Sequence, residues 1–130
     1  MINWRRSDKW MKAIVTEIGA SALDEKEPMI ILFGENATEG LKEYSVIQKF
    51  QELPTLDIKK GNLLRIDEQE YTIQYVGPFA NNNLNSIAHV TLVFAEVPEE
   101  DAIVNGLYLD PSQFPTIKVG TIIEYDSLGV

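Results

Sequence analysis

The stretch Ile87-Ala88-His89-Val90-Thr91-Leu92-Val93-Phe94 is the strongest strand pattern in the chain, and the rest of the sequence is interpreted outward from it. Successive side chains of a strand point to opposite faces of the sheet, so the stretch divides into two alternating sets. Val90, Leu92 and Phe94 form the more apolar set, and we expect them to face the core. His89 and Thr91 fall on the other, partly polar face, together with Val93.

Similar short strand patterns recur on both sides of this stretch and are separated by frequent turn signals. Two short segments favour helix: Asn36–Lys42, where Asn36 or Thr38 can cap the first turn, and Asn81–Leu84. Many short strands with little helix predict an all-β fold, a closed or partly open barrel or sandwich with one or two short helices. The other predicted strands are Lys12–Ile18, Met29–Phe33, Tyr44–Phe50, Leu63–Ile66, Glu70–Val76 and Thr121–Tyr125.

The domain organisation is simple, because 130 residues are the length of one domain. Residues Met1–Trp10 are polar and basic and contain both tryptophans, whereas a clean strand pattern begins near Met11. We therefore expect an N-terminal extension, residues 1–10, and a single β domain, residues 11–130. The alternative is that Trp4 and Trp10 pack on the domain or on a neighbour. The predicted core includes Val15, Ile31, Phe33, Ile73, Val90, Leu92 and Phe94.

Charge and composition exclude several classes of function. The net charge of −9 makes nucleic acid and anionic membranes poor partners and basic proteins good ones. The alternative is that the charge only keeps the protein soluble. The chain has no cysteine, which rules out disulfides, thiolate metal sites and a cysteine nucleophile. It also lacks a phosphate-cradling glycine loop, a Ser/His/Asp order and an HExxH pair, so we expect no metal and no cofactor.

His89 is the only histidine in the chain and is the candidate catalytic residue. A neutral imidazole nitrogen is a good nucleophile for phosphorus, and the hydroxyl of Thr91, two residues along, can donate to a phosphoryl oxygen. The alternative is a histidine that only forms hydrogen bonds within the fold.

Two blocks of the sequence resemble a known family. The first is Ile18-Gly19-Ala20-Ser21-Ala22 after the first strand. The second comprises Tyr71, Val76-Gly77, Ala80, Asn83-Leu84, Ile87, His89-Val90-Thr91-Leu92 and Phe94. They are similar to the glucitol/sorbitol-specific IIA components of the phosphoenolpyruvate-dependent sugar phosphotransferase system, whose second block contains Leu-Gly-His-Val-Thr-Leu. Pro54, Gly61 and the segment Gly120 to Tyr125 also match, so the resemblance spans about Met11 to Tyr125.

The resemblance implies a bacterial, cytoplasmic phosphocarrier of sugar-alcohol uptake. Such a protein accepts a phosphoryl group on a histidine from the basic phosphocarrier HPr. It then passes the group to a cysteine of the IIB component of a permease. The acidic composition of this chain suits a basic partner.

The strand Tyr44–Phe50 departs from the family pattern at a decisive position. The family there resembles Phe-Cys-Phe-Ile-His, and its phosphorylated histidine falls on Gln48 of this chain. An amide nitrogen is not nucleophilic, although glutamine can copy a hydrogen bond of neutral imidazole. Two interpretations follow. Either His89, which matches a supporting histidine of the family, is the phosphoryl acceptor, or the chain is a catalytically silent IIA-like binding or regulatory domain.

The resemblance also makes a geometric prediction. Gln48 and His89 should lie on neighbouring strands and face one shallow pocket, open to a partner and rimmed by apolar residues. Gln48 and Thr91, as binding residues, should lie with His89 at the floor of that pocket.

Overall fold

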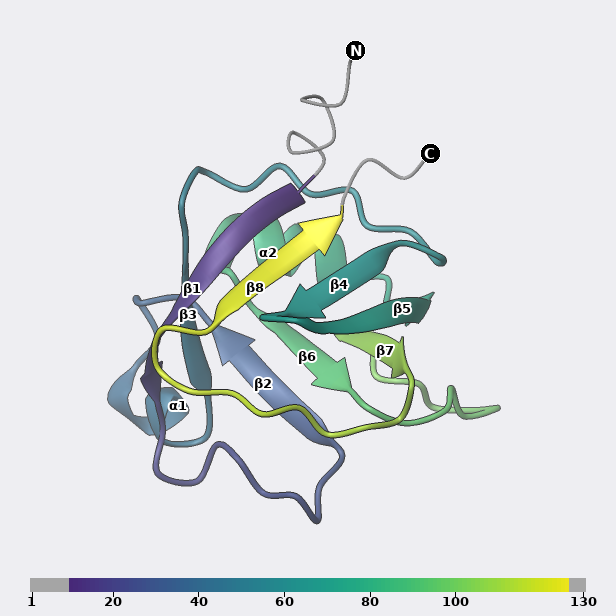
Figure 1. The fold of residues 1–130 in the computed structure, drawn as a ribbon, viewed down its shortest axis with the longest axis horizontal. Coiled ribbons are helices and arrows are strands. Elements are labelled where there is room, and N and C mark those ends of the chain that lie inside the picture. Colours follow the sequence, from purple (N-terminus) through teal and green to yellow (C-terminus); the bar gives the residue numbers. More distant parts are fainter. Residues whose placement is uncertain (1–9, 127–130) are drawn as a thin grey trace.

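Eight strands close into a barrel in residues 10–126, the part of the chain that the computed structural model describes (Figure 1). The all-β prediction, with one or two short helices, is confirmed. The strands are β1 (Trp10–Ile18), β2 (Met29–Phe33), β3 (Val46–Phe50), β4 (Leu63–Ile66), β5 (Gln69–Val76), β6 (Val90–Val93), β7 (Gly106–Asp110) and β8 (Ile122–Asp126). The helices are α1 (Glu39–Glu43) and α2 (Ala80–Ile87).

The strands follow one another around the barrel in the order β1-β3-β2-β6-β7-β5-β4-β8. Two neighbouring pairs, β2 with β3 and β6 with β7, are parallel, and the others are antiparallel. Parallel neighbours need a crossover connection, and α1 lies in the one that joins β2 to β3. Figure 1 shows α1 outside the barrel wall and α2 behind the barrel.

The inward-facing residues of the strands form one hydrophobic core. Of the predicted core residues, Val15, Ile73, Val90, Leu92 and Phe94 are buried in it. The prediction was wrong for β2, where Ile30 and Leu32 face the core and their alternates Ile31 and Phe33 are only half-buried. All five residues of β2 are apolar, so the sequence carries no alternation that could tell the two faces apart.

Two predicted boundaries near the candidate site also change. The stretch from Ile87 does not run as one strand, because Ile87 ends α2 and β6 begins only at Val90. His89 therefore precedes the strand rather than lying within it. In addition, β7 was not predicted, because Pro111 and Pro115 made that segment look broken, whereas the strand ends at Asp110, just before the first proline.

The barrel begins one residue earlier than expected. Trp10 pairs with Asp126 of β8, and the guanidinium of Arg65 lies 4.2 Å from the centre of the Trp10 ring. The remaining residues of the predicted extension, 1–9, lie outside the described part of the chain. Within residues 10–126, neither helix is long and apolar enough to cross a membrane.

Candidate functional site

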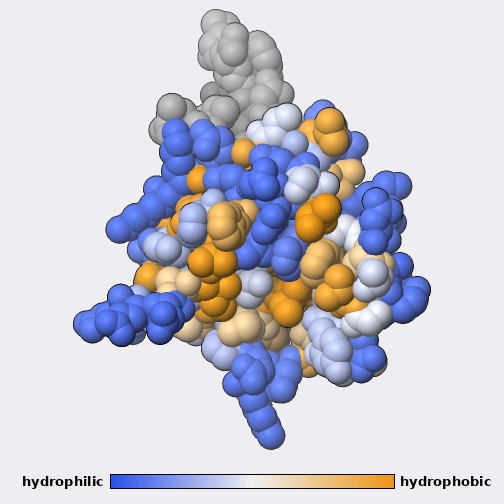
Figure 2. All heavy atoms as spheres, turned by 180° about the vertical axis from the view of Figure 1, so that it is seen from behind, coloured by the Kyte–Doolittle hydropathy of each residue, from blue (hydrophilic) through white to orange (hydrophobic). Residues whose placement is uncertain are grey.

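A cavity of about 530 Å³ opens between α1, the end of β3 and the C-terminal part of α2. Three large apolar residues line it and are well exposed, namely Leu41, Leu53 and Ile87. Glu35 and Glu52 add two negative charges and Lys49 one positive charge to the same lining. On the face that carries α2, hydrophobic residues gather near the middle among hydrophilic ones (Figure 2). The rim of the cavity is therefore partly apolar and partly charged.

One wall of the cavity is held by the side chains of α2. Asn85 bonds both backbone groups of Leu56, receiving its N–H at 2.7 Å and donating to its carbonyl oxygen at 2.9 Å. Asn81 does the same for Ile58, at 2.7 and 3.0 Å. Leu56 and Ile58 are buried in the core, so their backbone N–H and C=O groups need hydrogen-bond partners. The two amides supply the hydrogen bonds that a neighbouring strand would otherwise make.

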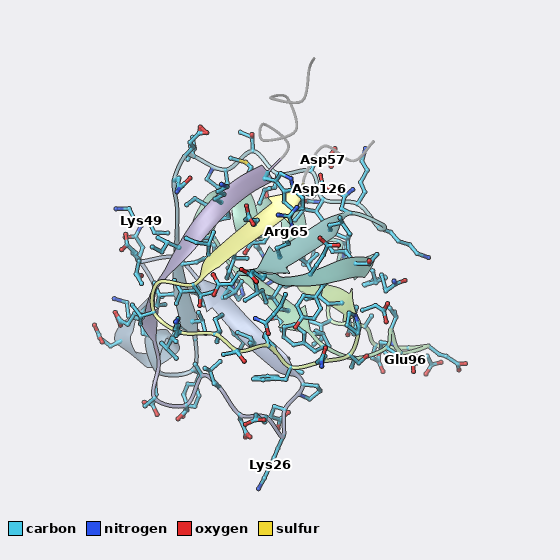
Figure 3. All side chains as sticks on the ribbon, in the orientation of Figure 1. Lys26, Lys49, Asp57, Arg65, Glu96 and Asp126 are labelled. Atoms are coloured by element: carbon cyan, nitrogen blue, oxygen red, sulfur yellow. The ribbon has the colours of Figure 1, made fainter. Side chains whose placement is uncertain are left out.

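Gln48 contributes to the cavity lining, and its side chain is fully buried. Its neighbour Lys49 extends outward from β3 (Figure 3), as alternation requires. The hydroxyl of Tyr125 donates to Oε1 of Gln48 at 2.7 Å, and Nε2 donates to the carbonyl oxygen of Ala88 at 3.0 Å. Burial raises the pKa of Tyr125 well above its ordinary value, and the bond to Gln48 offsets part of that rise. The hydroxyl is therefore a permanent donor at neutral pH.

His89 lies on the other side of the barrel wall from Gln48. Its ring stacks on Phe33, with centroids 3.8 Å apart and planes inclined by 13°. Phe33 alternates with the core residue Leu32, so the stack is on the outer face of β2. The ring is half-buried, and its backbone N–H donates to the carbonyl oxygen of Asn83 at 3.2 Å.

The hydrogen bond of the imidazole decides its tautomer. Nδ1 lies 2.9 Å from the carbonyl oxygen of Leu32. A carbonyl oxygen only accepts, so Nδ1 carries the proton and, in the neutral ring, Nε2 carries the free lone pair. Nε2 forms no hydrogen bond with any residue from 10 to 126. The arrangement thus leaves one nucleophilic nitrogen unoccupied.

The predicted common pocket was wrong in two respects. Gln48 is on β3 and His89 precedes β6, and β2 lies between these strands in the barrel. Neither His89 nor Thr91 lines the cavity, and Thr91 is buried, with 8% of its surface exposed. A single apolar residue, Phe33, connects the two places, since it lines the cavity and stacks on His89.

Sequence reasoning missed the residues that hold the site together. Tyr125, Leu32 and Phe33 are far from their partners in sequence, and nothing in the local pattern identifies them as site residues. Ala88 did carry a signal, because the family pattern has glycine at this position and Ala88 adopts φ 55° and ψ 32°, the left-handed region that favours glycine. Among residues 10–126, no three histidine or carboxylate side chains are grouped as metal ligands.

Comparisons with known proteins identify the family of the chain and a related fold. The profile of the family described as the glucitol/sorbitol-specific IIA component of the phosphotransferase system matches residues 10–124. The glucitol/sorbitol-specific EIIA components of Escherichia coli K12 and Shigella flexneri are each 35% identical over 115 residues, covering 88% of this chain and 92% of theirs. The crystal structure of a phosphotransferase-system IIA component from Enterococcus faecalis V583 superimposes with a TM-score of 0.86 at 53% identity, covering 88% of this chain and 98% of that one.

Proposed function

The chain belongs to the glucitol/sorbitol-specific IIA family of the phosphotransferase system, and on that premise we propose that it carries the phosphoryl group on His89. The family match over most of the chain supports a phosphocarrier that interacts with another phosphocarrier and with IIB components. It favours this role over a silent binding domain. The donor is a basic HPr-like protein, and the acceptor is the IIB component of a sugar-alcohol permease.

The observation that carries the assignment is the hydrogen bond between Nδ1 of His89 and Leu32. It leaves Nε2 as the only imidazole lone pair of the chain, because the chain has one histidine. Gln48, at the family's histidine position, offers only an amide, and both of its polar atoms are engaged. The nucleophile is therefore Nε2 of His89.

The transfer step follows from this geometry. The lone pair of Nε2 attacks the phosphorus carried by the donor, and the bond between phosphorus and the donor's nitrogen breaks as the new N–P bond forms. The transition state of phosphoryl transfer is loose, so the protein contributes mainly by positioning the nucleophile. In the product, Nε2 carries the phosphoryl group and Nδ1 keeps its proton, so the imidazole ring is positively charged. The carbonyl of Leu32, which accepts from Nδ1, stabilises that charge.

Thr91 is assigned a supporting role. Alternation puts its side chain on the outer face of β6, because Val90 and Leu92 face the core, and the stack of His89 on Phe33 is on the outer face of the neighbouring β2. Its hydroxyl donates to a phosphoryl oxygen of the phosphorylated ring.

The docking surface for the donor is the cavity beside Phe33. Leu41, Leu53 and Ile87 offer exposed apolar contacts, and Glu35 and Glu52 suit a basic partner. Phe33 lines the cavity and stacks on the ring of His89, so a donor seated in the cavity meets Phe33 first and extends past it to reach Nε2.

Intact mass after incubation with phosphoenolpyruvate, enzyme I and HPr tests the assignment. We expect the full chain to gain one acid-labile phosphoryl group, and His89→Ala and His89→Gln to gain none. Thr91→Val, which keeps the shape and removes the hydroxyl, should slow the gain about tenfold. The double variant Gln48→His/His89→Ala tests whether a histidine at the family's position accepts a phosphoryl group in this chain. Phosphorylation of that variant with none of the wild type would refute the assignment of His89.

A further inference from the structure

The amide of Gln48 links the barrel core to the backbone beside His89. Its Oε1 accepts from the Tyr125 hydroxyl at 2.7 Å, and its Nε2 donates to the Ala88 carbonyl at 3.0 Å. Tyr125 and Gln48 are both fully buried. A chain of two hydrogen bonds therefore runs from β8 through β3 to residue 88.

The bond from Gln48 acts on the peptide plane that enters His89. The carbonyl of Ala88 and the N–H of His89 belong to one planar peptide unit. Gln48 holds the carbonyl end, and the carbonyl oxygen of Asn83 holds the N–H end at 3.2 Å. With the plane fixed at both ends, the position from which the His89 side chain leaves the backbone is fixed as well.

The restraint matters because the backbone here is strained. Ala88 adopts φ 55° and ψ 32°, the left-handed region, which is sterically unfavourable for a residue with a Cβ. Such a residue tends to relax unless its surroundings hold it. Relaxation would rotate the peptide plane and carry the imidazole of His89 away from the Leu32 carbonyl and the Phe33 ring.

We propose that Gln48, where the family has its phosphorylated histidine, is a positioning residue that fixes the Ala88–His89 peptide and so places Nε2 of His89 for phosphoryl transfer. The inference rests on the assignment of His89 as acceptor. An amide suits the task because one side chain supplies both an acceptor for Tyr125 and a donor for Ala88. A carboxylate, although isosteric, has no proton for the carbonyl and would repel it.

Gln48→Glu makes this difference measurable. A protonated glutamate copies both hydrogen bonds, whereas an ionised one loses the bond to Ala88. The titratable groups around it are Tyr125, which contacts it, and Glu35, Lys49 and Glu52, which line the same cavity.

The experiment measures the rate of phosphoryl transfer from phosphorylated HPr between pH 6 and pH 9, as a ratio to wild type at each pH. Position 48 is fully buried, so burial should raise the pKa of the introduced carboxyl well above its ordinary value and keep it protonated at pH 6. For Gln48→Glu we therefore expect a ratio near one at pH 6 that falls about 10–100-fold by pH 9, in kcat rather than in KM for the donor. The matched control is Gln74→Glu, an exposed position on β5, whose ratio should stay flat. Tyr125→Phe, which frees one end of the amide, should lower kcat a few-fold.

A second readout keeps the inference separate from the assignment of His89. Imidazole ¹⁵N chemical shifts of the unphosphorylated protein report the tautomer of His89 without any transfer. We expect the Nδ1–H signature in wild type and in Gln74→Glu, and its partial loss in Gln48→Glu at pH 9. Altered shifts in Gln48→Glu together with an unphosphorylated wild type would support positioning and reject His89 as acceptor. A flat transfer ratio together with unchanged ¹⁵N shifts in Gln48→Glu would overturn the positioning role.

Discussion

Replacing Asn85 by alanine should loosen the segment that forms one wall of the cavity. Asn85 and Asn81 are four residues apart on α2, a rise of about 6 Å, and Leu56 and Ile58 are two residues apart in an extended chain, about 6.6 Å. This match lets each amide make two hydrogen bonds to one backbone residue. A segment outside any strand thereby has the backbone groups of both buried residues satisfied.

The magnitude follows from the two bonds lost. Each hydrogen bond contributes about 1 kcal/mol, and a buried backbone group left unpaired costs about 1–3 kcal/mol. Partial access of water to the segment lowers the total, so Asn85→Ala should destabilise by about 2–3 kcal/mol and Asn81→Ala by about 2 kcal/mol. The Asn81→Ala/Asn85→Ala double variant should lose less stability than the sum of the two single losses. Either substitution alone already loosens the segment that both asparagines hold.

Urea unfolding of the full chain measures these values. At an m-value of about 1.5 kcal/mol/M, the loss in Asn85→Ala lowers the midpoint by about 1.5 M. The matched control is Asn82→Ala on the same helix, because the side chain of Asn82 is exposed and makes no hydrogen bond within residues 10–126. Asn82→Ala and Asn85→Ala also gain the same helix propensity, because both replace asparagine by alanine within α2. Equal midpoints for Asn85→Ala and Asn82→Ala, with unchanged amide exchange at Leu56 and Ile58, would refute the reasoning.

Two further predictions concern stability. Gly77→Ala should destabilise the protein by about 2–3 kcal/mol, because the added Cβ would lie 2.3 Å from the carbonyl oxygen of Val104. The control is Gly40→Ala, whose Cβ meets nothing within 4 Å and should cause no loss of stability in the same urea assay. Burial raises the pKa of Tyr71 and Tyr125 in the folded state, so their neutral forms stabilise the fold. This contribution to the free energy of unfolding is complete below pH 10, the ordinary tyrosine pKa, and is lost as the pH rises above it. Stability followed from pH 9 to pH 12 should fall, and less steeply in Tyr125→Phe; equal slopes would contradict the assignment to Tyr125.

Local chemistry in the sequence was enough for several strands but not for those near the site. β2 and β4 have the predicted bounds, Met29–Phe33 and Leu63–Ile66, because turn residues flank them closely. The boundary between α2 and β6 was misplaced because Ile87 and Ala88 are apolar and only His89 separates them from Val90, so they resemble the start of the strand. Periodicity cannot separate a helix end from a strand start over so few residues.

The candidate site was predicted as a set of residues and not as an arrangement. Uniqueness singled out His89, and the family resemblance singled out Gln48, but their relation depends on contacts far apart in sequence. The hydrogen bonds of Gln48 reach 40 residues to Ala88 and 77 residues to Tyr125, and that of His89 reaches 57 residues to Leu32. Such pairs depend on barrel order, which places β2 between β3 and β6. Alternation within one strand therefore could not show that Gln48 and His89 lie on opposite sides of the wall.

The central claim is that Nε2 of His89 accepts the phosphoryl group, and the most direct test is to identify the phosphorylated nitrogen. Uniformly ¹⁵N-labelled protein, phosphorylated through enzyme I and HPr, would be examined by ¹⁵N and ³¹P NMR at alkaline pH, where phosphohistidine persists. We expect a single phosphohistidine in which ³¹P couples to Nε2 of His89. Phosphorus on Nδ1, which would require the bond to Leu32 to break, or no phosphohistidine at all, would contradict the account.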